Sequence, residues 1–416
     1  MTQSDKKTAF PYWARVVVVF FFGWVSLYAA RSVFSPVIGE IQSEFGLSQK
    51  EAGGMMSLFF LTYTALQIPS GILGDKIGRL KVLIPGFFLF AITLGLINWV
   101  SGYFAFMAMW MLVGAFQGTY YGPQYALSSE ALPKKWITVG SAIIGAGMSF
   151  GISLGYYTSS YMVNSLGTSW KSPFLVMAFM VGAVALFMAL VLREKAPPAD
   201  ESSAPAQAAS TEQSKEEFRF ADLFSNRNLV MAYITIFCSI YGFFVIITWL
   251  PYYLEHERGM DKETASYYAS LVPWISILGT LIASYVSDRL GKRKPVALSM
   301  LPLSLVAIFG IVYSTSDAML LAMLVLYGFI GKISLNPVLV ALVADNAPKS
   351  SLSTAFSFYN FFGMASSIVA PFATGWLGDV TGSLNSGFYC AAVITVIGII
   401  AMLFVNENYD DKAVKQ

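Results

Sequence analysis

Residues 20–36 have the sequence FFFGWVSLYAARSVFSP, an apolar and aromatic run that contains one charged residue, Arg31. The run makes up most of a membrane-spanning helix, which needs about 20 apolar residues. A guanidinium stays charged at accessible pH, and a cation placed in hydrocarbon is costly. Charged residues inside spans are usually paired or face a water-filled cavity. We therefore predict that Arg31 faces a cavity and binds the negative end of a small substrate.

The composition extends this pattern to the whole chain. Of 416 residues, 56% are hydrophobic and only 12% are charged, against about 25% charged residues in a soluble domain. Long continuous apolar runs, without short alternating segments, favour helices over a barrel. The predicted fold class is an all-α polytopic membrane protein with 12 transmembrane helices. We place them near residues 14–38, 52–73, 80–100, 103–131, 137–163, 172–193, 228–254, 264–286, 295–315, 318–344, 351–377 and 384–405.

The basic residues predict the orientation. With the N-terminus in the cytoplasm, 20 of the 26 Lys and Arg residues fall in cytoplasmic tails and connections, and four fall in outer connections. Cytoplasmic loops carry such an excess of Lys and Arg. We expect a multi-pass protein of the cell (inner or plasma) membrane with both termini in the cytoplasm.

Two cations remain, and both lie inside predicted spans: Arg31 in the first and Lys332 in the tenth. All 24 Asp and Glu residues fall in tails, connections or span ends by the same map. Lys332 lies about 20 Å from either end of its span, which is too deep for its ammonium to reach the surface easily. No carboxylate is left in mid-membrane to neutralise either residue, so the predicted interior attracts an anion.

The chain has two related halves. Residues 194–217 are rich in Pro, Ala, Ser and acidic residues, a composition that predicts a flexible linker. We expect a first six-helix bundle at 1–195, a cytoplasmic linker at 196–224 and a second six-helix bundle at 225–416. The sequence GILGDKIGRLK at 71–81 has its counterpart in ASYVSDRLGKRK at 283–294. Such a duplication predicts a substrate site where the two repeats meet.

The two loops resemble the signature loop of the major facilitator superfamily, and the resemblance covers all twelve spans. It implies two pseudo-symmetric six-helix bundles and a conformational rather than catalytic use of the loop charges. By this resemblance Asp75 caps a helix end, Arg79 pairs with Glu130, and Arg293 pairs with Asp345. The expected gating residues are Asp75, Arg79, Glu130, Asp288, Arg293 and Asp345.

A narrower resemblance links the chain to the anion:cation symporter family. It rests on Arg31 with the following residues through Ile41, on FGLS at 45–48, and on the pattern of residues 57–71. Residues 353–375 and 379–383 are similar as well. The resemblance implies that Arg31 binds a substrate carboxylate. Two features depart from the family: Ala30 stands where many members have an acid, and residues 114–124 contain none.

Helical spacing indicates which polar side chains share one face of a span, in the spans of these cations and in several others. Polar stripes on apolar spans are expected to turn inward, although single Ser and Tyr residues also serve helix packing. The predicted substrate-binding residues are Arg31, Lys332, Tyr28, Tyr63, Gln67, Gln117, Tyr121, Tyr241, Trp274, Asn336 and Asn360.

These features predict a secondary transporter of a small organic anion, a carboxylate and in some cases a dicarboxylate or sulfonate. The expected mechanism is alternating access with proton-coupled uptake, and exchange of one organic anion for another is the alternative. We expect a monomer in the lipid bilayer, with the anion and a co-transported proton as partners, and no nucleic acid. No enzyme activity, cofactor or metal centre is expected, since the chain has one His, two Cys, no nucleotide-binding loop and no nucleophile–base pair.

Two further classes stay open. An organophosphate exchanger ranks lower, because residues 233–254 contain no second arginine. A non-transporting sensor of the same fold would be separated from a carrier by measuring flux into vesicles. A drug/proton antiporter is disfavoured, because a cationic cavity repels cationic drugs. The many aromatic residues suit either an aromatic acid or a tight aromatic box around a small anion.

Overall fold

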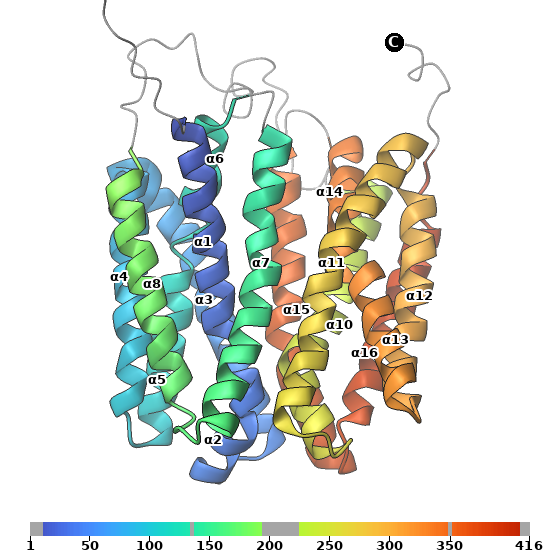
Figure 1. The fold of residues 1–416 in the computed structure, drawn as a ribbon. Coiled ribbons are helices and arrows are strands. Elements are labelled where there is room, and N and C mark those ends of the chain that lie inside the picture. Colours follow the sequence, from blue (N-terminus) through green and yellow to red (C-terminus); the bar gives the residue numbers. More distant parts are fainter. Residues whose placement is uncertain (1–10, 134–136, 194–223, 348–351, 408–416) are drawn as a thin grey trace, which may run out of the picture. The chain divides into compact units, whose positions relative to one another are not determined.

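The structure of the protein is a computed structural model. It describes residues 11–133, 137–193, 224–347 and 352–407, and within them every regular element is a helix (Figure 1). This confirms the predicted all-α class. Eleven segments of the described chain are long and apolar enough to cross a membrane. The predicted span 103–131 is not among them, because it is divided between two shorter helices.

The chain divides into two compact units, residues 1–34 with 61–203 and residues 35–60 with 204–416. Residues 35–60 thus group with the second half of the sequence, whereas the expected first bundle was continuous from 1 to 195. The boundary falls inside the long helix α3 (Gln49–Ile77), which contributes to both units. The expected linker, 196–224, lies almost wholly outside the described residues.

The first unit begins with α1 (Tyr12–Ser32), which packs along α7 (Ile137–Ser160). Gly147, Gly151 and Gly155 repeat every four residues on α7, and a Cβ atom at any of them would overlap backbone of α1. Small residues at this spacing let two membrane helices approach closely. The remaining elements are α4 (Arg79–Leu96), η2 (Ile97–Trp99), α5 (Tyr103–Gln117), α6 (Tyr121–Ala131), η4 (Tyr161–Ser165) and α8 (Ser172–Val191).

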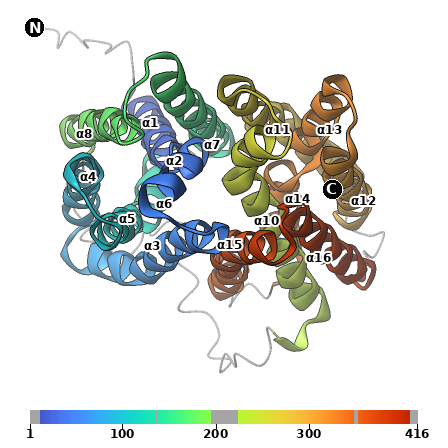
Figure 2. The same cartoon turned by 90° about the horizontal axis from the view of Figure 1, so that it is seen from below.

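The second unit is built around α10 (Arg227–His256), which packs against α15 (Leu352–Thr381) and α16 (Asn385–Leu403) (Figure 2). Its other elements are η1 (Ser35–Val37), α2 (Ile38–Phe45), α11 (Lys262–Leu290), α12 (Lys294–Tyr313), α13 (Asp317–Ile330) and α14 (Lys332–Asn346).

Three predicted spans are interrupted in the structure. Instead of running through 14–38, α1 ends at Ser32 and is followed by η1 and α2. The span at 103–131 breaks at 118–120 between α5 and α6, and the span at 318–344 breaks at Gly331 between α13 and α14. Pro123 and Pro337 lie inside α6 and α14, the helices that follow two of these breaks. Interrupted helices at matching places in two repeats are a common setting for transporter binding sites.

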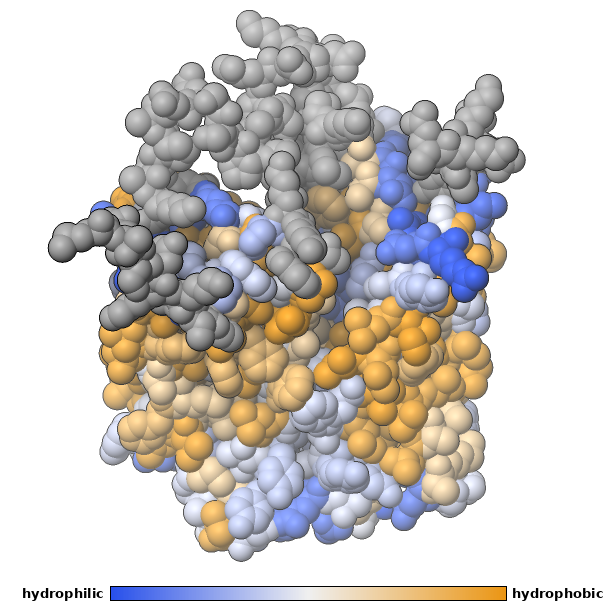
Figure 3. Space-filling model, turned by 45° about the horizontal axis from the view of Figure 1, so that its top comes forward, coloured by the Kyte–Doolittle hydropathy of each residue, from blue (hydrophilic) through white to orange (hydrophobic). Residues whose placement is uncertain are grey.

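The surface agrees with a membrane-spanning fold. On the face shown in Figure 3, hydrophobic side chains cover the middle of the helices, and hydrophilic side chains gather toward their ends. Residues such as Phe179 and Leu190 on α8 are each 73% exposed. Exposed apolar side chains in such numbers suit contact with lipid rather than water.

Candidate functional site

The two cations inside the spans both lie at helix breaks. Arg31 occupies the last turn of α1 and Lys332 is the first residue of α14. Each belongs to a different unit, and each has its own set of neighbours.

Arg31 is held by a glutamine and two tyrosines of the first unit. Its Nε donates a hydrogen bond to Oε1 of Gln117, with 2.6 Å between the two atoms. Its guanidinium carbon lies 4.9 Å from the ring centre of Tyr28 and 4.3 Å from that of Tyr63. The side chain is only 5% exposed. The structure therefore brings three other predicted site residues around this buried cation.

Two kinds of interaction stabilise the buried charge of Arg31 in the first unit: the partial negative charge of helix C-termini and contact with aromatic rings. Arg31 lies at the end of α1 and Gln117 at the end of α5, and a helix C-terminus carries a partial negative charge that favours cations. The negative faces of the two tyrosine rings add cation–π attraction. The helices α1, α4, α5, α7 and α8 contain no Asp or Glu. These helix and ring dipoles stabilise the charge of Arg31, and an incoming anion can meet that charge.

The hydrogen bond from Arg31 also fixes the orientation of the Gln117 amide. Arginine has only donors, so the oxygen of Gln117 must face it and the NH₂ group must point elsewhere. Gln117 is fully buried, and its Nε2 has no hydrogen-bond partner among the described residues. A buried donor without a partner is costly. An anion bound beside Arg31 would meet this second donor.

Aromatic rings continue from this point along the first unit. Trp24 lies 5.6 Å from Tyr28 and 6.3 Å from Tyr121 between ring centres. Tyr121 in turn lies 4.7 Å from Tyr125. The predicted residue Tyr121 therefore joins the Arg31 group through Trp24 of α1. Gln67 is partly buried, one turn after Tyr63 on α3.

Lys332 has a different environment in the second unit. Its Nζ lies 5.4 Å from the ring centre of Phe243 on α10. The carboxylates of α13 and α14 lie far along the chain, at Asp317 and Asp345, about 20 Å away along the helices. A helix N-terminus carries a partial positive charge, so the start of α14 and the ammonium of Lys332 both favour an anion.

A hydrogen bond lies one turn after Lys332. Tyr359 on α15 donates from its hydroxyl to Oδ1 of Asn336, with 3.2 Å between the atoms. Asn336 was predicted and Tyr359 was not, because its partner lies on another helix, which the spacing along α15 does not reveal. Asn360 itself is partly buried on α15, and Trp274 on α11 is 40% exposed.

Tyr241 is placed away from Lys332. It is 1% exposed, and its hydroxyl lies 3.5 Å from Sγ of Cys390 on α16. Phe243, which faces Lys332, follows two residues later and therefore points about 200° around α10. The structure thus places Tyr241 in the packing of α10 on α16 and separates it from the Lys332 group.

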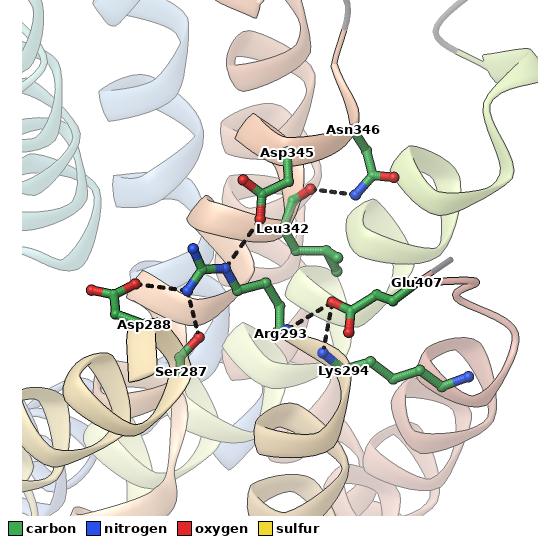
Figure 4. A network of polar contacts seen from close by, with 8 residues as sticks. All are labelled: Ser287, Asp288, Arg293, Lys294, Leu342, Asp345, Asn346 and Glu407. Atoms are coloured by element: carbon green, nitrogen blue, oxygen red, sulfur yellow. Dashed lines mark hydrogen bonds and ion pairs between the residues drawn. The ribbon is translucent and has the colours of Figure 1, made fainter. Parts of the chain in front are cut away.

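The expected loop ion pairs are present. Arg79 pairs with Glu130 in the first unit. In the second unit Arg293 reaches Oδ2 of Asp345 at 3.1 Å and Oδ1 of Asp288 at 2.7 Å (Figure 4). The side chain of Asp75 lies outside the described residues. The same charges therefore meet in both repeats, which agrees with their duplication in sequence.

The cluster around Arg293 includes further hydrogen bonds. Arg293 also donates to the hydroxyl of Ser287, and its backbone N–H and that of Lys294 donate to Glu407 (Figure 4). Partial burial disfavours the charged guanidinium, but the hydrogen bonds to Asp288 and Asp345 outweigh this effect and raise the pKa of Arg293 above its ordinary value. Arg293 therefore stays charged at any pH that the folded protein meets.

The side chain of Arg293 is 16% exposed and that of Arg79 is 27% exposed, so the two arginines should differ in their contribution to stability. We expect Arg293→Gln to lower the free energy of unfolding by about 1–3 kcal/mol, since it removes several charge-assisted bonds from a side chain only 16% exposed. Arg79→Gln should cost about 0.2–1 kcal/mol, the range for an exposed ion pair. Unfolding midpoints of both variants in the same detergent measure the difference. Equal midpoints would contradict this ranking.

A further polar cluster, within the second unit, was missed by the sequence analysis. Asp379 at the end of α15 accepts hydrogen bonds from the backbone N–H groups of Gln49 and Lys50, at 2.9 and 2.8 Å, and so caps α3. Lys262 on α11 pairs with Glu40 on α2 and lies 3.8 Å from Glu255. Ser35 donates to the backbone oxygen of Thr248. These bonds attach residues 35–60 to the second unit.

The comparisons with known proteins agree with this fold. The model of the Major Facilitator Superfamily matches residues 20–271 and again residues 232–416. The chain therefore belongs to this superfamily, and it is a membrane transporter rather than an enzyme. Among solved structures, a bacterial homologue of the human lysosomal transporter Spinster, in an inward-facing and occupied conformation, superposes with a TM-score of 0.76. It is 14% identical, and the match covers 95% of this chain and 96% of that one.

Two curated relatives are similar over nearly their whole length. The voltage-gated purine nucleotide uniporter SLC17A9 of Mus musculus is 27% identical over 91% of this chain and 86% of its own. The probable galactarate/D-glucarate transporter GudP of Bacillus subtilis (strain 168) is 26% identical over 97% of this chain and 94% of its own. These relatives confirm the resemblance to organic-anion transporters that the sequence indicated.

Proposed function

We propose that this protein transports a small organic anion, with a carboxylate bound by Arg31. The observation that carries the proposal is the buried Arg31, held by Gln117 and two tyrosine rings, at the end of α1 and beside α5, neither of which contains an acid. A guanidinium binds a carboxylate through two parallel hydrogen bonds. Binding also places a negative charge beside this buried cation, which offsets the cost of holding the cation away from water.

The relatives support an anionic substrate. Galactarate and D-glucarate carry two carboxylates, and a purine nucleotide carries phosphate, so both relatives are named for polyvalent anions. We propose that Lys332 serves a second negative or polar group of the substrate. This role suits its position at the N-terminus of α14 beside Phe243. A dicarboxylate or a sulfonated carboxylate fits this assignment better than a monocarboxylate.

We further propose proton-coupled uptake by alternating access, in the cell membrane and with cytoplasmic termini. The support is the resemblance to anion:cation symporters and the excess of Lys and Arg in the assigned cytoplasmic connections. The loop ion pairs Arg79–Glu130 and Arg293–Asp345 would open and close during the cycle. The groups available to carry a proton near the anion are Lys332 and the substrate itself.

Anion exchange is the second candidate, and a specific feature favours it. Ala30 precedes Arg31, and α5, which holds Gln117, contains no acid, so no carboxylate of α1 or α5 neutralises Arg31 when the substrate leaves. An exchanger would return only with another anion bound. Uptake into proteoliposomes separates the two mechanisms: an acidic exterior drives a symporter, and preloaded unlabelled anion drives an exchanger.

The substrate class is tested by a thermal-shift screen of the purified protein with carboxylates, dicarboxylates, sulfonates and phosphate esters. Hits are then tested for flux into proteoliposomes, which a non-transporting sensor would not show. Stabilisation by neutral sugars or cationic compounds, and by no anion, would contradict the proposal.

A lysine variant tests the proposed contact of Lys332 with a second group of the substrate. We expect Lys332→Met to reduce the affinity for a dicarboxylate by about tenfold or more, while the affinity for the matching monocarboxylate changes little. The control is Lys262→Met, which changes a lysine of the same unit that is paired with Glu40. If Lys332→Met lowered the affinity for the dicarboxylate and for the monocarboxylate equally, Lys332 would have a general electrostatic or structural role instead.

A further inference from the structure

An apolar groove of about 350 Å³ opens on the second unit, where α10, α15 and α16 meet. Ile234 and Cys238 on α10 contribute to its lining. Phe361 on α15 and Ile397 on α16 also line it, and they are 58% and 48% exposed. The groove is lined only by apolar residues and the thiol-bearing Cys238. It is therefore accessible from the outer surface of these helices, at a depth where the surroundings are hydrocarbon.

The groove exists because two of its helices meet closely at its floor. A Cβ at Gly398 of α16 would lie 2.9 Å from Cβ of Cys238, so α16 contacts α10 directly at this point. The small side chain of Ala365 on α15 leaves the space beside them open. A larger residue at position 365 would occupy the groove.

A cation lies at the end of the groove nearest the membrane surface. Arg227 begins α10 about two turns before Ile234, and Phe404 caps α16 about two turns after Ile397. The guanidinium carbon of Arg227 lies 5.2 Å from the ring centre of Phe404. Both intervals are seven residues, so this pair lies about 10 Å from the Ile234–Ile397 level of the groove. That distance separates a lipid headgroup from the hydrocarbon beneath it.

We propose that this groove binds one acyl chain of a bilayer phospholipid whose anionic headgroup contacts Arg227. The proposal is independent of the transported substrate. Arg227 is exposed and has no ion pair with any carboxylate that the structure describes. Lys294 adds a second positive charge near the end of α16, where its Nζ donates to the backbone oxygens of Leu403 and Val405. Basic residues between membrane helices commonly recognise anionic headgroups.

Native mass spectrometry of the full-length protein tests the proposal. The probes are phosphatidylglycerol and phosphatidylcholine with identical acyl chains. The expected result is one retained phosphatidylglycerol per chain and weaker retention of phosphatidylcholine. Arg227→Gln should lower phosphatidylglycerol binding about fivefold and leave phosphatidylcholine unchanged. The matched control is Arg289→Gln, which removes another exposed arginine, at the end of α11, and should have no effect.

The acyl-chain part of the site has its own variants. Ala365→Phe should fill the groove and reduce binding of both lipids, whereas Val393→Phe, at a 61% exposed position on α16 outside the groove, should not. Thermal unfolding without added lipid verifies that each variant is folded, and Ala365→Leu replaces Ala365→Phe if that variant is not. Equal retention of the two lipids by the unaltered protein, or undiminished binding by the groove-filling variant, would overturn the proposal.

Discussion

Replacing Arg31 with alanine is expected to lower the affinity for the transported anion by at least about 30-fold and to abolish measurable uptake. Removing one partner from a buried, hydrogen-bonded charge pair costs at least about 2 kcal/mol. Arg31 is 5% exposed, and its Nε is fixed by Gln117, so water cannot easily replace the lost donor. The measurements are anion-induced thermal stabilisation of the purified protein and uptake into proteoliposomes.

The lysine variant separates charge from geometry. Arg31→Lys keeps the positive charge but loses the planar fork that binds a carboxylate in two places, so we expect intermediate affinity. Arg15→Ala is the matched control, because it removes an exposed arginine from the other end of α1. Normal anion binding by a folded Arg31→Ala protein would refute the assignment.

Folding must be controlled separately, because Arg31→Ala leaves the buried oxygen of Gln117 without its donor. An orphaned buried acceptor costs about 1–3 kcal/mol of stability. The double variant Arg31→Ala, Gln117→Leu removes both polar groups and should recover part of that loss. It should not recover transport, because the cation is still absent.

The sequence predicted the part of the structure that depends on bulk hydrophobicity and on charge. The lengths of the apolar runs were sufficient to locate the spans. The absence of acids from the middle of the predicted spans identified Arg31 and Lys332 as candidate anion-binding residues. The loop motif correctly paired Arg79 with Glu130 and Arg293 with Asp345. These inferences succeeded because a charged side chain in hydrocarbon is costly unless it is paired or faces a water-filled cavity.

The helix breaks were harder to predict, because an apolar run does not show where a helix ends inside it. The prolines at 123 and 337 lie near two of the breaks but not at them, and α1 ends at Ser32, before Pro36. The position of Tyr241 was missed for a related reason. Its face of α10 is set by contact with Cys390 on α16, which no local spacing reveals.

Residues 35–60 were assigned by sequence order to the first bundle, yet they pack with the second unit. The cause is a set of contacts between segments more than 200 residues apart, including Ser35 with Thr248 and Glu40 with Lys262. The small residues that permit close packing here have no distinguishing mark in a sequence with 34 glycines. Their importance is visible only from the atoms that a side chain would meet.

The adjacent glycines Gly53 and Gly54 of α3 allow the contribution of this close packing to stability to be measured. A Cβ at Gly53 would overlap the backbone oxygen of Pro371 on α15, whereas a Cβ at Gly54 would meet only Phe372, at an ordinary 3.7 Å. We expect Gly53→Ala to destabilise the protein by about 1–3 kcal/mol, since backbone must shift to admit the methyl group. Gly54→Ala should be neutral or stabilising by up to about 1 kcal/mol, because alanine favours a helix.

Thermal or denaturant unfolding in one detergent compares the two variants, which share the same substitution, helix and net charge. The helix-propensity gain is common to both, so the difference between them isolates the contact of α3 with α15. That contact lies beside the cap that Asp379 places on Gln49 and Lys50, and its loss should loosen the attachment of residues 35–60 to the second unit. Identical unfolding midpoints for the two variants would mean that α3 and α15 separate at little cost, and the close packing at Gly53 would then contribute nothing to stability.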